Sequence, residues 1–345
     1  MKAVVFREHG GPERFQYTDA PQPSLGDEDV LVEVRACAIN HLDVWVRQGV
    51  PAYQIPLPHI TGSDVSGIIA KIGPRVHGLP PGQRVILSPG ISCFACAWCA
   101  AGHDNLCDQF KIRGAQIAGG YAQFAAAHMR DVLPLPESLT FEQGAAFPLV
   151  FMTAWHMLIT RCRLQAGQTV LVLAGGSGIG SAAIQIAKLA GARVFATVGS
   201  DAKADRAKAL GADAVMNYTK EDFAKRAREL TGGRGVDVVF EHVGPATWAN
   251  SLKSLAKNGQ LVTCGSTTGP EAACDLRYIF SRQLSVLGSI MGTRADLLAL
   301  LPLIAAGTLQ PVIDTVFPLR EAIRAHERLL ARDHFGKFIL VPEKS

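Results

Sequence analysis

The sequence has 345 residues, of which 48% are hydrophobic and 19% are charged, with a formal net charge of +4. A chain of this length exceeds the size at which one hydrophobic core usually stops growing, so we expect two domains. The charges form no basic run, which argues against nucleic-acid and membrane partners and favours small molecules. No stretch approaches ~20 consecutive apolar residues, and the N-terminus MKAVVFREHGGPERF lacks a signal-peptide core. We therefore expect a cytoplasmic globular protein.

Residues 1–150 are rich in short β-like runs such as KAVVF, DVLVEVRACAI, VSGIIAKI and QRVILS. Turns that contain Pro and Gly, including PQPSLGDED and LPPGQ, separate these runs. Short runs of β-branched residues between such turns are typical of strands joined by loops. The sequence therefore predicts a β-rich first domain.

Residues 93–107 read CFACAWCAAGHDNLC and hold four of the eight cysteines in the chain. In a reducing compartment a close cysteine cluster is more often a metal site than a disulfide framework. Four thiolates suit the tetrahedral coordination of Zn²⁺ and leave no position open for water or substrate. We therefore predict one structural Zn²⁺ whose ligands are Cys93, Cys96, Cys99 and Cys107.

From residue 168 onward, β-like and helix-like segments alternate. The order is QTVLVLA, the helix IGSAAIQIAKLAG, ARVFATV, the helix DAKADRAKALGA, DAVMNY, VDVVFEHV, a helix near TWANSLKSLAKN, GQLVTCG and SVLGSI. Such alternation is typical of a parallel sheet, and six strands fit a doubly wound arrangement. We place this domain at residues 151–291. Residues 292–345 are expected to return to the first domain, because the terminal run KFILV needs a sheet to join.

The segment VLVLAGGSGIGSAAIQIAKLAG combines a strand, a glycine turn with Gly175, Gly178 and Gly180, and a helix. Such a turn brings helix amides and the positive end of the helix dipole onto a pyrophosphate. Ser177 stands where the middle glycine of the strict G-x-G-x-x-G pattern would fall. About 20 residues past such a loop, NAD-dependent enzymes carry an acidic residue. Here the second strand ends in TVGS, with no carboxylate to repel a phosphate, and Lys203 follows, so we expect NADP(H).

The β-rich first domain, the Cys-x2-Cys-x2-Cys-x7-Cys lobe and the dinucleotide-binding domain together resemble the medium-chain dehydrogenase/reductase superfamily. The resemblance covers essentially the whole chain. It implies an α/β fold in which a GroES-like β-rich catalytic domain is joined to a Rossmann domain with a doubly wound parallel six-stranded sheet. It also implies that the zinc of the cysteine lobe, residues 93–107, is structural.

Alcohol dehydrogenases of this family carry a second, catalytic zinc with one open coordination position. The segments ACAINHLDVW, PHITGSDVSG and AAFPLVFMTAW resemble those that supply its three ligands. In the best register Asn40, Ser63 and Leu149 occupy the ligand positions, so all three ligands are missing. These segments instead resemble the zinc-free quinone oxidoreductase branch of the family.

The resemblance implies that Asn40 borders the substrate cleft, where its amide would serve the substrate oxygen or the nicotinamide ribose. His41, Asp43 and Asp64 fall in segments that border the same cleft, so they are candidates for the proton donor. The resemblance also implies that Tyr218 and Lys203 hold the 2′-phosphate of NADP(H). The full set that we assign to cofactor binding is Thr153, Gly175, Ser177, Gly178, Ile179, Gly180, Ser200, Lys203, Tyr218, Gly265 and Lys337.

Three functions are compatible with these residues. In the first, NADPH delivers hydride to an activated alkene, an enone or a quinone without a catalytic metal, and neutral donors stabilise the developing enolate. In the second, Cys37, His41 and Asp43 form a non-standard zinc site of an alcohol dehydrogenase or carbonyl reductase. In the third, the protein is a non-catalytic NADPH-binding sensor or structural protein. Family members are dimers or tetramers, which implies a homodimer or homotetramer, often joined through the last strand of the cofactor domain, here SVLGSI.

Overall fold

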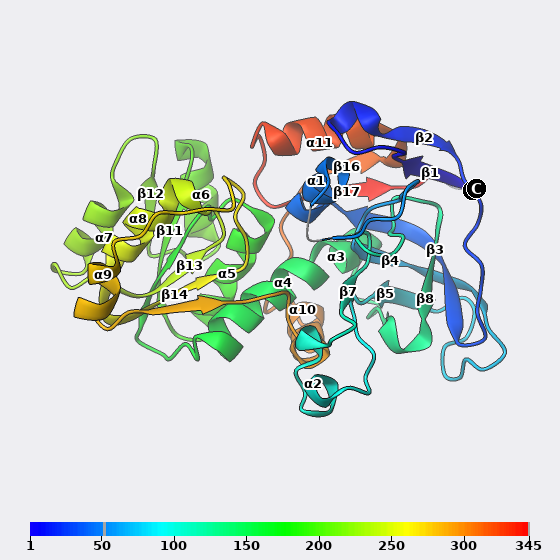
Figure 1. The fold of residues 1–345 in the computed structure, drawn as a ribbon, viewed down its shortest axis with the longest axis horizontal. Coiled ribbons are helices and arrows are strands. Elements are labelled where there is room, and N and C mark those ends of the chain that lie inside the picture. The colour runs from blue at the N-terminus through cyan, green and yellow to red at the C-terminus, as the bar shows by residue number, and fades with distance from the viewer. Residues whose placement is uncertain (51–52, 344–345) are drawn as a thin grey trace. The chain divides into compact units, whose positions relative to one another are not determined.

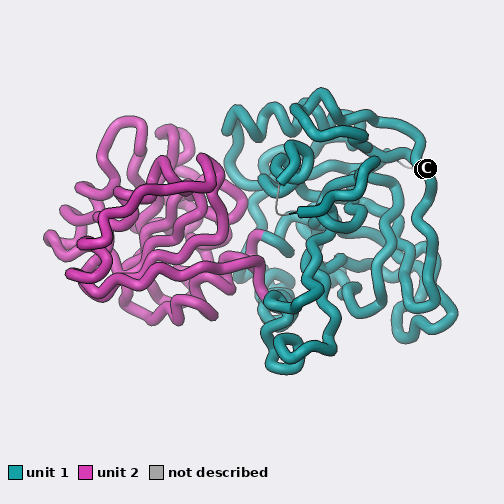
Figure 2. The backbone as a smooth tube through the Cα atoms, viewed as in Figure 1, with its two compact units in different colours: residues 1–149, 293–345 teal, residues 150–292 magenta. Residues whose placement is uncertain are grey.

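The computed structural model describes residues 1–50 and 53–343, and the chain divides into two compact units (Figures 1 and 2). Unit 1 comprises residues 1–149 and 293–345, and unit 2 comprises residues 150–292. Most strand pairs of unit 1 are antiparallel, whereas the sheet of unit 2 is parallel throughout. The α/β fold class expected from the sequence is confirmed. Within the described ranges, no helix has the length and apolar character needed to cross a membrane.

The main sheet of unit 1 has seven strands among the residues that the structure describes, in the order β16-β17-β3-β4-β5-β9, with β8 also paired to β3. The long strand β3 (Asp29–Ala38) is buried along most of its length on both faces, in agreement with its nearly continuous apolar sequence. The other strands are β4 (Asp64–Ile72), β5 (Arg84–Leu87), β8 (Phe124–His128), β9 (Val132–Pro134), β16 (Ile313–Pro318) and β17 (Lys337–Val341).

Smaller sheets of unit 1 pair β1 (Lys2–Val5) with β2 (Gln16–Asp19) and β6 (Gly90–Ile91) with β7 (Lys111–Ile112). The helices of this unit are α1 (His41–Gln48), α2 (Ala97–Ala100), α3 (Phe141–Ala146), α10 (Arg294–Ala305) and α11 (Ala322–Leu330). Helix α4 (Pro148–Trp155) crosses the boundary between the units and continues as a π-helical turn, His156–Arg161. Short 3₁₀ segments span Pro12–Arg14, Asp104–Leu106, Met129–Asp131 and Leu319–Glu321.

Three strands of the main sheet meet at the carboxyl end of β3. Ala38 pairs with Asp64, the first residue of β4, on one side and with Ile339 of β17 on the other. Both neighbours are antiparallel to β3, so each of them begins beside the place where β3 ends. The residues that directly follow β3 therefore lie next to the first residues of β4 and β17, although almost 300 positions separate the most distant of them in sequence.

Unit 2, in which every residue is described, carries a six-stranded parallel sheet in the order β12-β11-β10-β13-β14-β15. The strand order reverses at β10, and the carboxyl end of this strand is the topological switch point at which doubly wound sheets bind ligands. The strands are β10 (Thr169–Val172), β11 (Arg193–Val198), β12 (Ala214–Asn217), β13 (Val236–Glu241), β14 (Leu255–Thr263) and β15 (Ser285–Gly288). The helices are α5 (Gly178–Leu189), α6 (Asp201–Ala209), α7 (Phe223–Leu230), α8 (Pro245–Ser254) and α9 (Leu276–Ser281).

One helix of unit 2 is shorter than its sequence suggests. The segment TWANSLKSLAKN reads as a helix, yet α8 ends at Ser254 and β14 begins at the next residue. Leu255 is fully buried and pairs with Val236 of β13, and Asn258 adopts a left-handed conformation with a φ of +60°. Burial of Leu255 in the sheet therefore outweighs the helical preference of this segment.

Candidate active site

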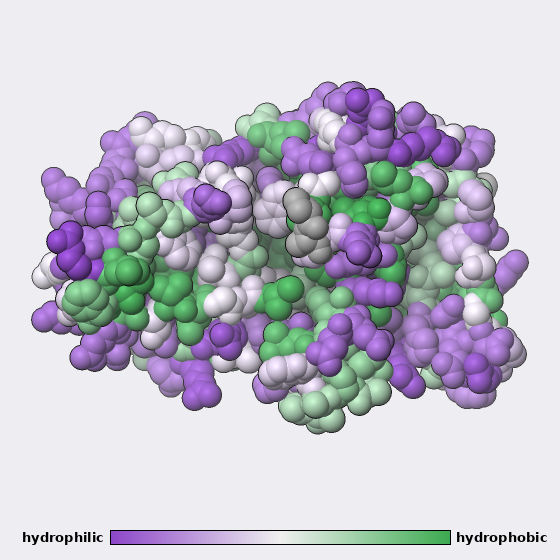
Figure 3. Space-filling model, viewed as in Figure 1, coloured by the Kyte–Doolittle hydropathy of each residue, from purple (hydrophilic) through white to green (hydrophobic). Residues whose placement is uncertain are grey.

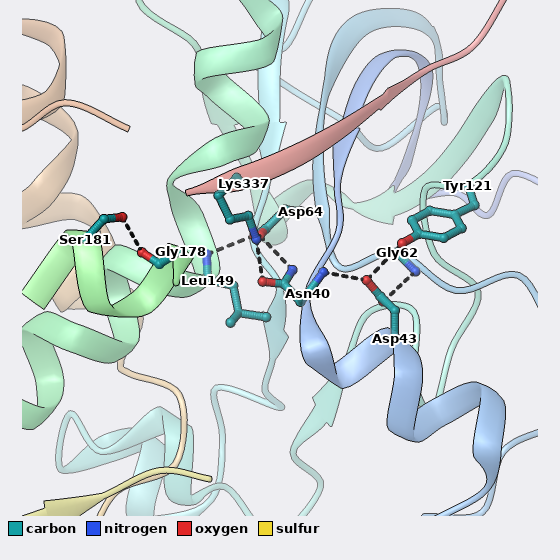
Figure 4. Close-up of polar contacts among 9 residues, drawn as sticks. All are labelled: Asn40, Asp43, Gly62, Asp64, Tyr121, Leu149, Gly178, Ser181 and Lys337. Carbon is teal, nitrogen blue, oxygen red and sulfur yellow. Dashed lines mark hydrogen bonds and ion pairs between the residues drawn. The ribbon is translucent and has the colours of Figure 1, made fainter. Parts of the chain in front are cut away.

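Asn40, Asp64 and Lys337 form a closed hydrogen-bonded triangle in unit 1 (Figure 4). The Asn40 amide donates through Nδ2 to Asp64 Oδ2 at 2.9 Å, and Lys337 Nζ donates to Asn40 Oδ1 at 2.5 Å. Lys337 Nζ also lies 3.3 Å from Asp64 Oδ2. All three side chains are buried, and Asn40 is the most accessible of them at 6% exposed. The structure thus brings two predicted catalytic residues together with Lys337, which the sequence analysis assigned to the cofactor.

Burial and pairing act in opposite directions on the two charges of this triangle. Desolvation raises the pKa of Asp64 and lowers that of Lys337, while the charge of each favours the ionised form of the other. The second carboxylate oxygen of Asp64 accepts the backbone N–H of Leu149 at 2.8 Å. A buried pair with these additional hydrogen bonds holds its geometry, because removal of one partner leaves an uncompensated charge at a cost of about 3–5 kcal/mol.

Asp43 holds the amino end of α1 against the segment that precedes β4. Its Oδ1 accepts the Thr61 hydroxyl at 2.8 Å and the Gly62 N–H at 3.2 Å. Its Oδ2 accepts the Asn40 N–H at 2.8 Å, as in a capping box, and the Tyr121 hydroxyl at 3.0 Å. The arrangement makes this carboxylate an acceptor of four hydrogen bonds that fixes Asn40 from the backbone side. Its assignment as a proton donor stays a prediction.

Tyr121 and His326 extend this network, and sequence reasoning missed both. The single hydroxyl proton of Tyr121 is donated to Asp43, so His326 Nε2, 3.1 Å from the same hydroxyl, is the donor of that contact. Burial lowers the pKa of His326 to about 3, which keeps the ring neutral. No motif surrounds these residues; the one local signal is the pair of glycines that precedes Tyr121 in the sequence.

Gly62 explains why the network packs so closely. Its φ of +103° lies in the region that favours glycine, and a Cβ there would stand 2.4 Å from Tyr121 Cδ1 and 2.7 Å from Cys37 Sγ. Only a glycine therefore lets the backbone beside Asp64 approach the tyrosine ring.

His41, the remaining catalytic candidate, is the first residue of α1, and its ring packs edge-on against Trp45 with 5.0 Å between the centroids.

The four cysteines of the lobe lie close enough together to share one metal ion. Their sulfur atoms all fall within 4.8 Å of one another, and no other group of three or more candidate ligands is found among the described residues. Cys93 Sγ accepts the N–H groups of Ala95 and Cys96 at 3.4 and 3.3 Å. Such N–H···S contacts orient and stabilise thiolates. This donor set fits a closed tetrahedral zinc site.

Electrostatics also favour a cation between these sulfurs. Hydrogen bonds from the backbone N–H groups of Cys99 and Asp108 lower the pKa of Cys96 to about 6. Desolvation and the neighbouring thiols raise the pKa of Cys99 to about 12. Four negative charges within a few ångströms are therefore unfavourable without a positive ion, which a divalent metal supplies.

The glycine turn of unit 2 lies at the carboxyl end of β10, at the topological switch point of the sheet. Ser177 caps α5, and its hydroxyl accepts the Gly180 N–H at 3.0 Å. A Cβ on Gly180 would stand 2.3 Å from the carbonyl oxygen of Ala174, so glycine is required where the helix approaches the strand. Gly178 and Ile179 are the first residues of α5, whose N–H groups have no intrahelical acceptor. This cradle fits the pyrophosphate of a dinucleotide.

The ends of the neighbouring strands frame the same edge of the sheet. Gly199 and Ser200 follow β11, and a Cβ on Gly199 would stand 2.6 Å from the Tyr218 hydroxyl that follows β12. The first acidic residue beyond the strand, Asp201, binds Asn217 Nδ2 at 2.8 Å and Lys220 Nζ at 2.6 Å. The other assigned residues are placed as follows: Lys203 is half-buried on α6, Gly265 follows β14, and Thr153 is buried on α4.

Glu241, at the end of β13, is a fully buried carboxylate that sequence reasoning missed. It accepts the N–H groups of Val243 and Gly244 at 2.6 and 3.1 Å and the Ser251 hydroxyl at 2.6 Å. These contacts fix the turn that leads into α8. Its signal in the sequence was a lone acidic residue at the end of an apolar strand, VDVVFE.

Two family models match the chain: the alcohol dehydrogenase GroES-like domain at residues 26–137 and the zinc-binding dehydrogenase domain at residues 178–306. The chain is 30% identical to a quinone oxidoreductase of Rattus norvegicus, over 99% of this chain and 98% of that protein. It is 30% identical to a crotonyl-CoA reductase of Streptomyces collinus, over 94% and 82%. Among solved structures, an NAD-dependent alcohol dehydrogenase is 45% identical with a TM-score of 0.95, over 99% of both chains.

A change of Cys96 to Ser tests the metal site. We expect the purified variant to hold less than one zinc ion per chain, where the unchanged protein holds one, and to melt at a lower temperature, because the serine hydroxyl is a poor zinc ligand and the lobe loses a cross-link. Elemental analysis and thermal unfolding measure both. Cys162, which is buried outside the lobe, supplies the control: its change to Ser should leave the zinc content intact. A C96S variant that retains full zinc would contradict the assignment.

Proposed function

The chain belongs to the medium-chain dehydrogenase/reductase superfamily and is an oxidoreductase of its quinone oxidoreductase-like and alcohol dehydrogenase-like subgroup, and on this premise we propose that it transfers hydride from NADPH to an activated alkene, an enone or a quinone without a catalytic metal. The observation that carries this proposal is the Asn40 amide. It is neutral, and Asp64 and Lys337 hold it at a position where the resembling zinc enzymes carry a metal ligand.

The hydrogen bonds of Asn40 indicate how it would act. Its oxygen accepts from Lys337, and one of its two N–H groups donates to Asp64. Neither Asp64 nor Lys337 uses the second N–H, so it can donate to a carbonyl oxygen of the substrate. Bound NADPH supplies the hydride. Addition of that hydride at the β-carbon moves the alkene electrons onto the carbonyl oxygen, which the amide stabilises as an enolate, and a solvent proton at the α-carbon completes the saturated product.

Two further observations support a reaction without catalytic zinc. Ser63 and Leu149 occupy the remaining ligand positions of the resembling zinc enzymes, and neither suits zinc. Asp43, a member of the alternative Cys37–His41–Asp43 site, already accepts four hydrogen bonds through its two oxygens. Recruitment of that carboxylate to a metal would cost these bonds and release the amino end of α1. The non-standard zinc site is therefore the less favoured alternative.

We propose NADP(H) as the cofactor and a structural zinc in the cysteine lobe. No carboxylate stands at the end of β11, and Asp201 is held by Asn217 and Lys220. We assign Ser200, Lys203 and Tyr218 to the 2′-phosphate, because hydroxyl and ammonium groups are suitable phosphate ligands. The reduced thiols that zinc requires favour the cytoplasm as the location.

The proposal predicts that the purified protein oxidises NADPH in the presence of enones or quinones and holds one zinc ion per chain. Asn40→Ala should lower kcat by about 10²-fold, the cost of one lost oxyanion donor. It should also lower stability by about 1–3 kcal/mol, because Lys337 and Asp64 each lose a buried hydrogen bond to the amide. Turnover of alkenals, ketones and quinones, together with elemental analysis, tests these expectations. Two zinc ions per chain would favour the alcohol dehydrogenase alternative. Tight NADPH binding with no turnover across the panel would favour a non-catalytic protein.

Cofactor preference is tested at Gly199. We expect Gly199→Asp to shift the preference from NADPH toward NADH by at least tenfold in kcat/KM, because its carboxylate repels the 2′-phosphate and accepts from the ribose hydroxyls. Gly199→Ala is the matched control, since its Cβ meets the Tyr218 hydroxyl in the same way without adding a charge. The same NADPH/NADH ratio in the aspartate and alanine variants would refute the position assigned to the phosphate.

We further propose that the chain forms a homodimer through β15, the edge strand of the parallel sheet. Val286 of this strand is 41% exposed, and Leu276 and Phe280 of the neighbouring helix α9 are 68% and 70% exposed. Hydrophobic residues gather at α9 in Figure 3. An uncovered edge strand and a large apolar patch both favour association. Sedimentation velocity should give the mass of two chains, and Leu276→Asp/Phe280→Asp should give single chains; a monomeric unchanged protein would contradict the proposal.

A further inference from the structure

Lys337 reaches an amide rather than open solvent. Its ammonium group is buried, and the side chain is 4% exposed. Its two closest polar partners are Asn40 Oδ1 at 2.5 Å and Asp64 Oδ2 at 3.3 Å. A lysine that holds the phosphate of a soluble ligand ordinarily keeps a mobile, hydrated ammonium group. The position of Lys337 instead suits a residue that acts on its protein neighbours.

The two charges together leave the Asn40 side chain one orientation. An amide that was rotated by 180° would direct its NH₂ group at the ammonium of Lys337 and its oxygen at the carboxylate of Asp64, so both contacts would become repulsive. In the observed orientation both contacts are attractive. Asp64 is itself fixed by the Leu149 N–H at 2.8 Å, and the Asn40 backbone is fixed by Asp43 at 2.8 Å. The free N–H of the amide therefore has a single, preorganised direction.

The cation also changes the strength of the donor. A cation that donates a hydrogen bond to an amide oxygen draws electron density from the amide nitrogen. Linked hydrogen bonds strengthen one another in this way. The Asn40 N–H that faces a ligand is therefore a better donor with Lys337 in place than without it. The benefit grows as negative charge develops on the acceptor, so it is greater for an enolate than for the ground-state carbonyl.

We propose that Lys337 and Asp64 are positioning residues which orient and polarise the Asn40 amide toward a carbonyl oxygen of the substrate, so that Lys337 acts on the hydride-transfer step and not on cofactor affinity. The inference rests on the proposed function, in which Asn40 is the donor. It departs from the assignment of Lys337 to the cofactor. A positioning role predicts an effect on kcat, whereas a cofactor-binding role predicts an effect on the KM for NADPH.

Lys337→Met and Lys337→Arg separate the two roles. We expect Lys337→Met to lower kcat for enone reduction by ten- to thirtyfold with the KM for NADPH changed less than twofold, and Lys337→Arg to recover most of the loss because it keeps the charge. Lys203→Ala is the matched control: as a phosphate ligand it should raise the KM for NADPH with little change in kcat. Because Lys337→Met leaves Asp64 unpaired, the double variant Asp64→Asn/Lys337→Met keeps the buried site neutral and should show the same kinetic pattern if the single variant does not fold.

Binding is measured apart from turnover, as the dissociation constants of NADPH and of cyclohexanone on the NADP⁺-loaded protein. Cyclohexanone has a carbonyl group but no activated alkene. The inference is supported if Lys337→Met weakens cyclohexanone binding by fivefold or more and leaves NADPH binding unchanged. This holds even if no acceptor is reduced, in which case only the proposed function fails. An NADPH dissociation constant raised by tenfold or more with unchanged cyclohexanone binding would overturn it. So would the absence of cyclohexanone binding in the unchanged protein.

Discussion

The burial of two opposite charges at the meeting point of three strands is the constraint on which the rest of unit 1 depends. Asp64 and Lys337 begin strands β4 and β17, and both strands flank the end of β3. Each charge offsets the desolvation of the other, and removal of either would leave an uncompensated charge in the interior at a cost of about 3–5 kcal/mol. The pair therefore requires that the C-terminal strand of the chain dock on the first domain in one register.

The rigidity of the neighbouring polar groups follows from this pairing and from Asp43. Asp43 ties the start of α1 to Thr61, Gly62 and Tyr121, while Asp64 ties it to Leu149. Gly62 permits this close packing, because a side chain at this residue would collide with Tyr121. Asn40 thus has its backbone fixed by one carboxylate and its amide by another. Preorganised dipoles of this kind lose little energy to reorientation when charge develops nearby.

Unit 2 achieves order by a different route, through rules that act over short distances. The glycine turn, the Ser177 cap and the first residues of α5 are consecutive in sequence, so their geometry follows from local backbone preferences. Likewise the cysteine lobe places its four sulfurs within one loop of 15 residues, 93–107. In both cases the residues that would hold a ligand are neighbours in the chain, and a short motif is enough to predict them.

The sequence by itself determined the two-domain α/β architecture, the six parallel strands and the clustering of the four cysteines, because strand and helix periodicity, glycine turns and ligand spacing are local properties. It also marked Asn40, Asp43 and Asp64 through family resemblance, but not what they contact. Only the tertiary structure decided that Lys337 lies on Asn40 rather than at the surface, that Tyr121 and His326 join Asp43, and that Leu255 starts a strand. These contacts join residues up to 297 positions apart. They depend on strand register and on the free energy of burying charge, neither of which can be read from neighbouring letters.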